Sequence, residues 1–264
     1  MPITPPDWMP TPTNRQLKIA NATLDTAVSQ LVAARRMGQP SSTPDVLDLL
    51  IAARNSDQQP LTEREIRDEI VTFIVAGHET VAAALTWSFA MLAAHPQIQD
   101  QLHDEVNDVV TPDALSMHQL SDLPLTRACI DEALRLYPPA WLITRKALSD
   151  DELAGARIPA GALIIMSPWL VHRHPGFWTE PHSYMPSRFL EGNVVRHAFI
   201  PFGNGLRLCI GRDFAYAEAI AVVARLMSRF ELSYPDGKAI PEVHPSVTMR
   251  PIGGLHLHVN TRSR

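Results

Sequence analysis

The chain has 264 residues, of which 45% are apolar and 19% are charged, and its formal net charge is −5. This composition is that of an ordinary globular protein, and the acidic balance argues against a partner that is nucleic acid. Two cysteines exclude a disulfide scaffold. No apolar run approaches the roughly 18 residues of a membrane span, so we expect no membrane segment. The first 12 residues show no secretory signal pattern, and a cytoplasmic location is expected.

Helical patterns dominate the first half of the chain. A proline-rich lead-in reaches residue 16, and apolar spacing predicts helices over 17–37 and about 44–54. A much longer helix is predicted from about residue 60, where Thr62 and Glu65 form a capping box, to the residue before Pro96. Its middle, from Val71 to Leu92, is apolar nearly all round, which predicts burial.

Shorter and more mixed elements follow. Pro96 begins a helix that runs to about Val109, and a long stretch over 174–208 is rich in proline, glycine and aromatic residues without periodicity. Such long irregular stretches are usually functional. The other predicted elements are a helix over about 125–137, β-type runs over 141–167, a helix over 215–230 and short strands over 231–259. The pattern predicts a mainly α protein with small β-sheets (α+β).

The segment from Phe202 to Gly211 is the most informative. Gly205 lies four residues before Cys209, Gly211 lies two after it, and a predicted helix begins just beyond. Glycine permits left-handed turns and close approach to a ligand, and a helix N-terminus beside Arg207 favours an anionic sulfur.

Other uses of a cysteine were compared with this one. Cys129 has no such surroundings and is predicted to be a small buried hydrophobe. A zinc site at Cys209 lacks ligands at the usual spacing, since His197 is 12 residues away. A catalytic Cys–His nucleophile stays open, because nothing assigns the base.

The cysteine segment resembles the haem-binding signature of the cytochrome P450 family, F-x-x-G-x-R-x-C-x-G. It matches at all five fixed positions, which are Phe202, Gly205, Arg207, Cys209 and Gly211. The resemblance implies that Cys209 is the axial thiolate of heme b, iron protoporphyrin IX. It also implies that Arg207 pairs with a haem propionate and that Phe202 packs near the sulfur.

Further motifs of that family follow in the expected order. Glu132 and Arg135 resemble its E-x-x-R motif, and residues three apart share a helical face, although such a pair on a solvated helix is commonplace. Residues 186–189 resemble the motif whose arginine, here Arg188, completes a buried Glu–Arg–Arg network, with a serine in place of the more usual acid. Arg145 falls where relatives place a propionate-binding arginine; the alternative is a surface arginine at a strand edge.

The long helix carries Ala76-Gly77-His78-Glu79-Thr80, which is similar to the family's oxygen-activation signature A-G-x-[DE]-T. Ala76 and Thr80 share one face with Gly77 beside them, and small residues leave room for a ligand. The resemblance implies that Thr80 and Glu79 are catalytic and deliver protons. Two alternatives stay open: Glu79 tied in a salt bridge, and the Thr80 hydroxyl bonded to the carbonyl four residues earlier.

The resemblance is clear over about 60–255 and looser over 1–59. It implies the C-terminal portion of the cytochrome P450 fold, as a single partial domain over 1–264. A helical lead-in over 1–59 would precede the long helix and its followers over 60–140, and the strands, irregular stretch, cysteine loop and last helix over 141–264. Family members are considerably longer, so we expect that an N-terminal portion with the substrate-access loops is missing.

The function implied is that of a haem-thiolate monooxygenase. It would oxidise an apolar organic substrate with dioxygen, taking electrons from a redox partner, either a flavoprotein reductase or a ferredoxin. The alternatives are a non-catalytic or truncated haem-binding fragment that needs the missing N-terminal half, and a haem sensor or peroxide-using enzyme. No role is assigned to His172, His174 or His182 in and beside the irregular stretch.

Overall fold

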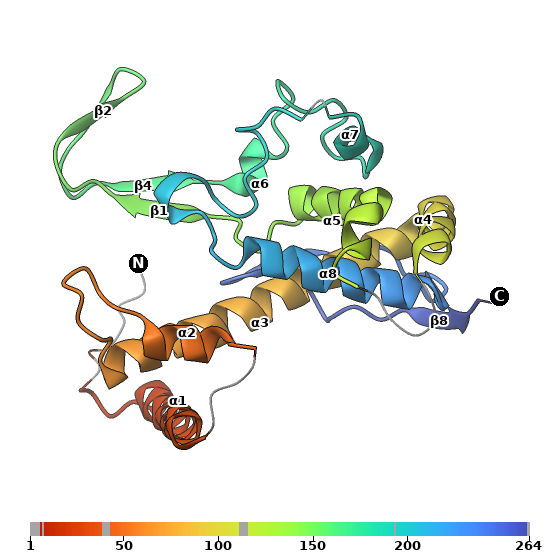
Figure 1. Ribbon diagram of the computed structural model, residues 1–264. Coiled ribbons are helices and arrows are strands. Elements are labelled where there is room, and N and C mark those ends of the chain that lie inside the picture. Colours follow the sequence, from red (N-terminus) through yellow and green to blue (C-terminus); the bar gives the residue numbers. More distant parts are fainter. Residues whose placement is uncertain (1–5, 7, 39–42, 111–115, 193, 263–264) are drawn as a thin grey trace. The chain divides into compact units, whose positions relative to one another are not determined.

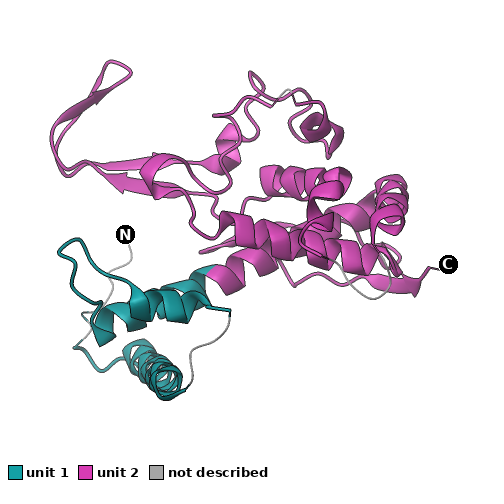
Figure 2. Ribbon diagram, in the orientation of Figure 1, with its two compact units in different colours: residues 1–76 teal, residues 77–264 magenta. Residues whose placement is uncertain are grey.

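The structure is a computed structural model and describes residues 6, 8–38, 43–110, 116–192 and 194–262. The chain divides into two compact units, Met1–Ala76 and Gly77–Arg264, coloured teal and magenta in Figure 2. The single partial domain expected over 1–264 stays a prediction.

The first unit is helical. It holds α1 (Pro12–Met37), α2 (Val46–Ala52) and the first part of α3 (Glu63–Ala94), as Figure 1 shows. α1 begins earlier than predicted because Pro12 fits the first helical position and the Thr11 hydroxyl accepts the Asn14 N–H at 3.1 Å. The core of this unit consists of Val28, Val32, Leu47, Ile66 and Ile70.

The start and end of α3 confirm the sequence prediction. Thr62 and Glu65 form the capping box: the Thr62 N–H donates to the Glu65 carboxylate at 2.7 Å, and the Glu65 N–H donates to the Thr62 hydroxyl at 3.2 Å. At the other end, α4 begins at Pro96. Local chemistry therefore determines both limits of this 32-residue helix.

The predicted burial of α3 is correct for only part of its length. Trp87 and Leu92 are fully buried, but the residues over 72–78 are exposed, including Phe73, Ile74 and Val75. Apolar composition predicts that a face prefers to be covered, whereas coverage depends on which other elements pack there. The expectation of a buried middle is therefore wrong for this segment.

α3 also corrects the expectation that no apolar stretch approaches the length of a membrane span. An 18-residue window of this helix has a mean hydropathy of 1.4, which is enough to cross a membrane by length and composition. This window includes the charged residue Glu79, and its mean hydropathy is still high enough. The same test is passed by core helices of soluble proteins.

The second unit is built on the C-terminal part of α3, α4 (Pro96–Val109), α5 (Pro124–Leu136) and α8 (Arg212–Met227), which lie together in Figure 1. The short 3₁₀ helix η1 (Gln119–Asp122) precedes α5. Their apolar faces form one core that includes Leu102, Ile130, Val223 and Met227. Buried Gln99 joins α4 to the segment after α8, because its amide donates to the Leu232 carbonyl at 3.0 Å.

The strands of this unit form small antiparallel pairs. Among the described residues there are four two-stranded sheets. They are β1 (Ile143–Lys146) with β4 (Leu163–Met166), β2 (Asp151–Leu153) with β3 (Ala156–Ile158), β5 (Phe230–Ser233) with β8 (His258–Thr261), and β6 (Val243–Pro245) with β7 (Met249–Pro251). The predicted class, mainly α with small β-sheets, is confirmed.

The stretch over 174–208 is irregular, as predicted. It contains two short helical segments, α7 (Ser187–Leu190) and η2 (Gly205–Arg207), and it follows α6 (Pro168–Val171). Backbone groups in such a stretch need partners other than a helix or sheet ladder. Buried side chains of α5 supply some of these hydrogen-bond partners, and these side chains belong to the candidate site.

Candidate functional site

Cys209 lies in the loop that joins η2 to α8, and we call residues 202–211 the cysteine loop. Gly203 and Gly205 have φ angles of +73° and +70°, which lie in the left-handed region that favours glycine. The Cys209 N–H donates to the Phe202 carbonyl at 3.0 Å, so the loop closes on itself. The cysteine therefore stands just before the first turn of α8.

The two cysteines differ in their surroundings as the sequence predicts. Cys129 is buried, and burial raises the pKa of its thiol to about 12. Cys209 is exposed, and so are the apolar side chains near it on the loop and the first turn of α8: Leu206 (105%), Ile210 (87%) and Phe214 (75%). The Cys209 sulfur thus lies beside an uncovered apolar surface.

Phe202 links the cysteine loop to the helices beneath it. Its ring lies 5.0 Å from the ring of Tyr216 on α8, and the Tyr216 hydroxyl donates to Asp131 of α5 at 2.6 Å. The guanidinium of Arg127 lies 3.2 Å from the centre of the Tyr216 ring and also pairs with Asp131. Burial raises the pKa of Asp131 and of Tyr216.

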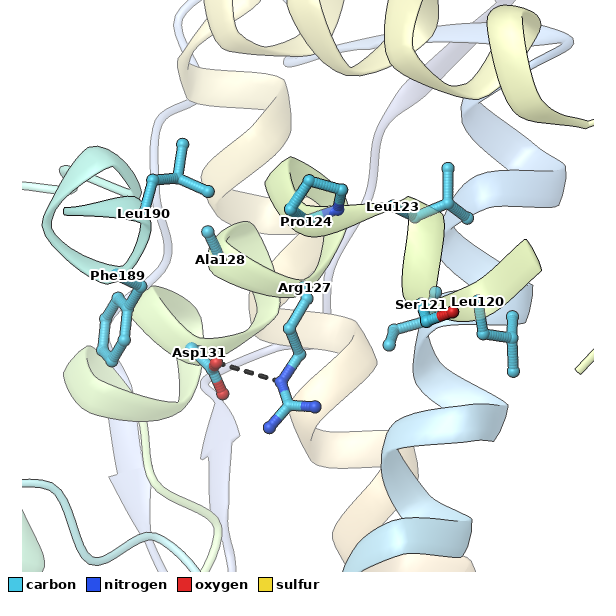
Figure 3. Close-up of a pocket in the computed structure, with 10 residues that line it drawn as sticks. Leu120, Ser121, Leu123, Pro124, Arg127, Ala128, Asp131, Phe189 and Leu190 are labelled. Carbon is cyan, nitrogen blue, oxygen red and sulfur yellow. Dashed lines mark hydrogen bonds and ion pairs between the residues drawn. The ribbon is translucent and has the colours of Figure 1, made fainter. Parts of the chain in front are cut away.

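A hollow of about 360 Å³ opens beside this cluster, and Figure 3 shows Arg127 and Asp131 facing each other in it. The other lining residues are Leu120, Ser121, Leu123, Pro124, Ala128, Phe189, Leu190 and Ile220. None of the site residues predicted from the sequence lines this hollow.

Glu132, Arg135 and Arg188 meet in one cluster, which we call the buried ion-pair assembly. The side chains of Glu132 and Arg135 are 0% exposed. Their two contacts measure 2.7 Å and 2.8 Å, a bidentate pair, and Arg188 Nε reaches Glu132 at 3.1 Å. The Met185 N–H also donates to Glu132 at 2.8 Å. The alternative of a solvated helical pair is therefore wrong.

Arg135 also organises the irregular stretch. Its Nη1 donates to the carbonyls of His172 at 2.8 Å and Pro181 at 2.7 Å, and its Nη2 donates to the carbonyl of Ser183 at 3.0 Å. These carbonyls have no helix or sheet ladder to enter. One buried guanidinium supplies the hydrogen bonds that regular structure supplies elsewhere.

His172 is a functional candidate that the sequence reasoning missed. It is fully buried, and its ring nitrogens contact the Arg135 carbonyl at 3.2 Å and the Ile200 N–H at 2.9 Å. Burial lowers the pKa of His172 to about 3, so the ring is neutral. The only sequence signal was a histidine at the edge of the irregular stretch, because Ile200 lies 28 residues further along the chain.

The residues of the oxygen-activation motif lie on α3. Ala76, in the first unit, and Gly77, in the second, are both exposed, and a Cβ on Gly77 would meet nothing within 4 Å. Thr80 is half-buried. Ala76 and Gly77 add little bulk to this turn of the helix, and the room that they would leave for a ligand stays a prediction.

Glu79 is held by the strands near the C-terminus. The Thr248 hydroxyl donates to its carboxylate at 2.5 Å, and Arg250 of β7 forms an ion pair with it. Hydrogen bonds from Thr248 and then Arg250 lower the pKa of Glu79. The alternative of a salt bridge, left open for Glu79, is the one found in the structure.

The remaining predicted residues, Arg207, Arg145 and Gly211, have few contacts within the chain. Arg207 is exposed and forms no ion pair with any residue that the structure describes. Arg145 on β1 is exposed and donates to the Thr144 carbonyl at 2.8 Å. Gly211 has a φ of −84°, which any residue can adopt, and a Cβ there would meet the Cys209 sulfur at 4.0 Å, an ordinary contact.

These features fit a haem group. The exposed cysteine before a helix matches the iron, and the uncovered apolar surface from Leu206 to Phe214 matches the ring. The exposed cation of Arg207 matches the haem carboxylates. Cys209 would supply the thiolate ligand.

Comparison with known proteins places these observations in a wider context. Residues 1–258 match the family described as cytochrome P450. Pentalenene oxygenase from Streptomyces avermitilis is 36% identical over 247 residues, which cover 92% of this chain and 53% of that protein. Cyclooctat-9-en-7-ol 5-monooxygenase from Streptomyces melanosporofaciens is 36% identical over 228 residues, which cover 85% of this chain and 50% of that protein.

A solved structure shares the fold. The retinoic acid bound cyanobacterial CYP120A1 superposes with a TM-score of 0.90 at 29% identity, covering 98% of this chain and 60% of that one. The chain thus spans about half the length of the curated relatives it matches. The family match and the structural superposition each extend over almost every residue, so the likeness is not limited to a few motifs. The chain belongs to the cytochrome P450 family.

Proposed function

We propose that this chain carries the haem-binding and oxygen-activating part of a monooxygenase that acts on an apolar organic substrate. The observation that carries the proposal is the exposed Cys209 on an apolar surface, in a loop that precedes α8. Heme b with a thiolate ligand supplies the redox chemistry that activates dioxygen. One oxygen atom enters the substrate and the other leaves as water, with electrons from a separate redox protein.

The chain's own residues contribute binding and proton transfer. The cysteine loop presents the Cys209 sulfur, and Arg207 and Arg145 offer cations for the propionates. Ala76 and Gly77 keep one turn of α3 free of bulk, and the Thr80 hydroxyl would donate a hydrogen bond to an oxygen ligand there. Glu79 is ionised at neutral pH because Thr248 and Arg250 stabilise its carboxylate. In the proposed role Glu79 leaves the ion pair with Arg250 and then passes protons from solvent toward Thr80.

Substrate, partner and location are finer parts of the proposal. One relative is named for pentalenene, so pentalenene is a reasonable first substrate to test. A flavoprotein reductase and a ferredoxin system should each be tested as electron donor. A cytoplasmic location is proposed as well, and cell fractionation tests it.

A second candidate function is haem binding without turnover by the 264-residue chain. The observation that favours it is the exposed segment of α3 from Phe73 to Val75, which leaves this part of the helix open to water. Water at such a site diverts oxygen chemistry from the substrate. Peroxide formation without product would support this candidate, and product formation would support the first.

The test is a carbon monoxide difference spectrum of the chain after loading with haem and reduction with dithionite. A red-shifted Soret band typical of thiolate ligation is expected from the wild type and from the control Cys129→Ala. The band should be absent from Cys209→Ser. Absence of haem uptake by the wild type, or a band that survives Cys209→Ser, contradicts the proposal.

A further inference from the structure

His172 lies between the end of α5 and the segment just before the cysteine loop, and its ring makes one hydrogen bond to each. Nδ1 lies 3.2 Å from the Arg135 carbonyl oxygen, and Nε2 lies 2.9 Å from the Ile200 backbone nitrogen. The residue follows α6 as its C-cap and is 0% exposed. Its side chain therefore joins two backbone segments that are far apart in sequence.

The partners determine the tautomer of the ring. A carbonyl only accepts hydrogen bonds, so Nδ1 carries the proton toward Arg135. A backbone N–H only donates, so Nε2 is the unprotonated acceptor for Ile200. Both nitrogens are thus engaged in a neutral ring. A buried imidazole with both nitrogens occupied by backbone has no free position for substrate or solvent, so acid–base catalysis is not its role.

The contact with Ile200 continues into the cysteine loop. The Ile200 carbonyl accepts the Gly203 N–H at 3.0 Å, which forms the turn that begins the loop, and the Phe202 carbonyl accepts the Cys209 N–H at 3.0 Å. The ring of His172 also lies 5.3 Å from the ring of Phe199. Hydrogen bonds therefore hold the backbone at both ends of the segment that precedes Cys209.

At its other end, His172 is tied to the buried ion-pair assembly. Arg135 Nη1 donates to the His172 carbonyl at 2.8 Å, while Glu132 holds the same guanidinium. Arg135 thus contacts His172 twice, through its side chain and through its own carbonyl. Through His172, the start of the cysteine loop is therefore connected by hydrogen bonds to a buried and fully paired cluster.

We propose that His172 is a positioning residue that fixes the cysteine loop against the C-terminal end of α5 and so holds Cys209 in place for its ligand. The fixing of the loop stands on the hydrogen bonds alone. The consequence for a haem ligand rests on the proposed function. The residue acts through Ile200 and the turn at Gly203, and it need not touch the bound group.

Two variants of similar size separate the two hydrogen bonds. His172→Gln keeps an acceptor near the place of Nε2, for the Ile200 N–H. His172→Asn keeps a donor near the place of Nδ1, for the Arg135 carbonyl. If His172 serves only as filling for the core, the two variants should behave alike. If it positions the loop, only the asparagine variant should release it.

The first measurement uses the haem-free 264-residue chain and follows amide hydrogen exchange. We expect His172→Asn to speed exchange at Ile200 and Gly203 by about tenfold or more, the factor that corresponds to one lost buried hydrogen bond, and His172→Gln to stay near wild type. Equal exchange at these amides in the two variants overturns the proposal. So does a loss of protection across α5 in both, because His172 would then support the whole unit rather than the loop.

Thiol chemistry and spectroscopy then report on Cys209 itself. In the haem-free chain an aromatic disulfide reagent reads only Cys209, since Cys129 is buried, and its rate should change in His172→Asn and not in His172→Gln. With haem, dithionite and carbon monoxide, the thiolate band should weaken in the asparagine variant alone.

The two proposals can fail separately. A wild type without the thiolate band contradicts the proposed function, and hydrogen exchange still decides whether His172 holds the loop. A wild type with the band, together with an asparagine variant whose band and thiol rate are unchanged, overturns the positioning of Cys209.

Discussion

The buried ion-pair assembly and the cysteine loop lie in the same unit and differ in exposure and in how fully the protein itself covers their side chains. Glu132 and Arg135 are 0% exposed and their polar atoms are engaged by protein partners, whereas Leu206 and Ile210 beside Cys209 are almost fully exposed. The assembly is complete within this chain. The loop presents chemistry that needs another group to cover it.

The difference shows how one site divides its tasks. Burying charge is costly, and it is tolerated where geometry and hydrogen bonds compensate fully. An exposed apolar surface is costly as well, and it persists where a ligand or partner uses it. His172 spans the two regions, so the rigid one can determine where the open one lies.

The largest effect is expected from breaking the assembly. Arg135→Met keeps an unbranched side chain about as long as the aliphatic part of arginine. Among the described residues it leaves Glu132 with only Arg188 as an ion-pair partner, and it removes the donors to three backbone carbonyls. Removing one partner of a buried pair costs about 3–5 kcal/mol, a large share of the roughly 5–15 kcal/mol that stabilises a domain. Urea denaturation followed by circular dichroism measures it.

The matched control is Arg157→Met, which breaks an exposed pair with Asp150. Exposed pairs contribute little to stability, so this variant should unfold close to wild type. Equal destabilisation by the two substitutions would mean that burial of the assembly contributes nothing, and the comparison above would fail.

The second effect sharpens the link between the regions through pH. Burial lowers the pKa of His172 from 6.5 to about 3, and the nearby charges of Arg135 and Arg173 act in the same direction. Between these values the unfolded chain binds a proton at this residue and the folded chain does not. The free energy of unfolding therefore falls as pH drops from about 6.5 toward 3, by about 1.4 kcal/mol for each unit of pKa difference.

Urea midpoints measured from pH 7 to pH 4 give this slope. Carboxylates also titrate in the range, so the informative quantity is the difference between wild type and His172→Gln, which has no group to titrate there. The variant should show the shallower slope. Parallel slopes would mean that His172 is solvated in the folded chain.

The sequence could predict features that depend on residues close together in the chain. The capping box at Thr62 and Glu65, the start of α4 at Pro96 and the left-handed conformation of Gly205 depend on neighbours in sequence, and all were accessible to a reading of the chain. The spacing of Glu132 and Arg135 was equally local, but their burial depends on the irregular stretch that wraps over them. Sequence alone could not supply that coverage.

The failures have the same cause. The exposure of α3 over 72–78 depends on what packs against it, which no periodicity encodes. His172 contacts Ile200 across 28 residues, and Glu79 contacts Arg250 across 171. A residue whose task is defined by distant backbone carries no local pattern, so a histidine without a motif was passed over.

A smaller effect is expected at Glu79, which resembles neither region fully because its partner Arg250 is more than half exposed. Glu79→Gln should lower the thermal midpoint slightly, and much less than Arg135→Met, since solvent screens the pair and the Trp87 indole still holds the Met249 carbonyl at 3.0 Å. The pKa of Glu79 is lowered, so the pair stabilises the fold above the unfolded pKa and is lost as pH falls through the folded value.

Calorimetry at pH 7 and pH 4 tests this. The difference between wild type and Glu79→Gln should narrow at the lower pH. Thr248→Val serves as a control that removes one donor and leaves the ion pair. A difference that widens at low pH would contradict the assignment of an ionised Glu79.

The smallest effect on the free energy of unfolding is expected in the cysteine loop, because its apolar side chains are exposed in the haem-free chain. Ile210→Ser and Phe214→Ser remove apolar side chains that are 87% and 75% exposed, so the haem-free chain should keep its free energy of unfolding within about 0.5 kcal/mol. Leu102→Ala, in the core, should cost about 2–5 kcal/mol. The same two serine variants should bind haem more weakly in a titration, because the ring would then lose apolar surface to cover.

A large loss of stability without haem would show that these side chains are already buried in solution, for example against a second copy of the chain. The open region would then be an interface, and concentration-dependent sedimentation would reveal it.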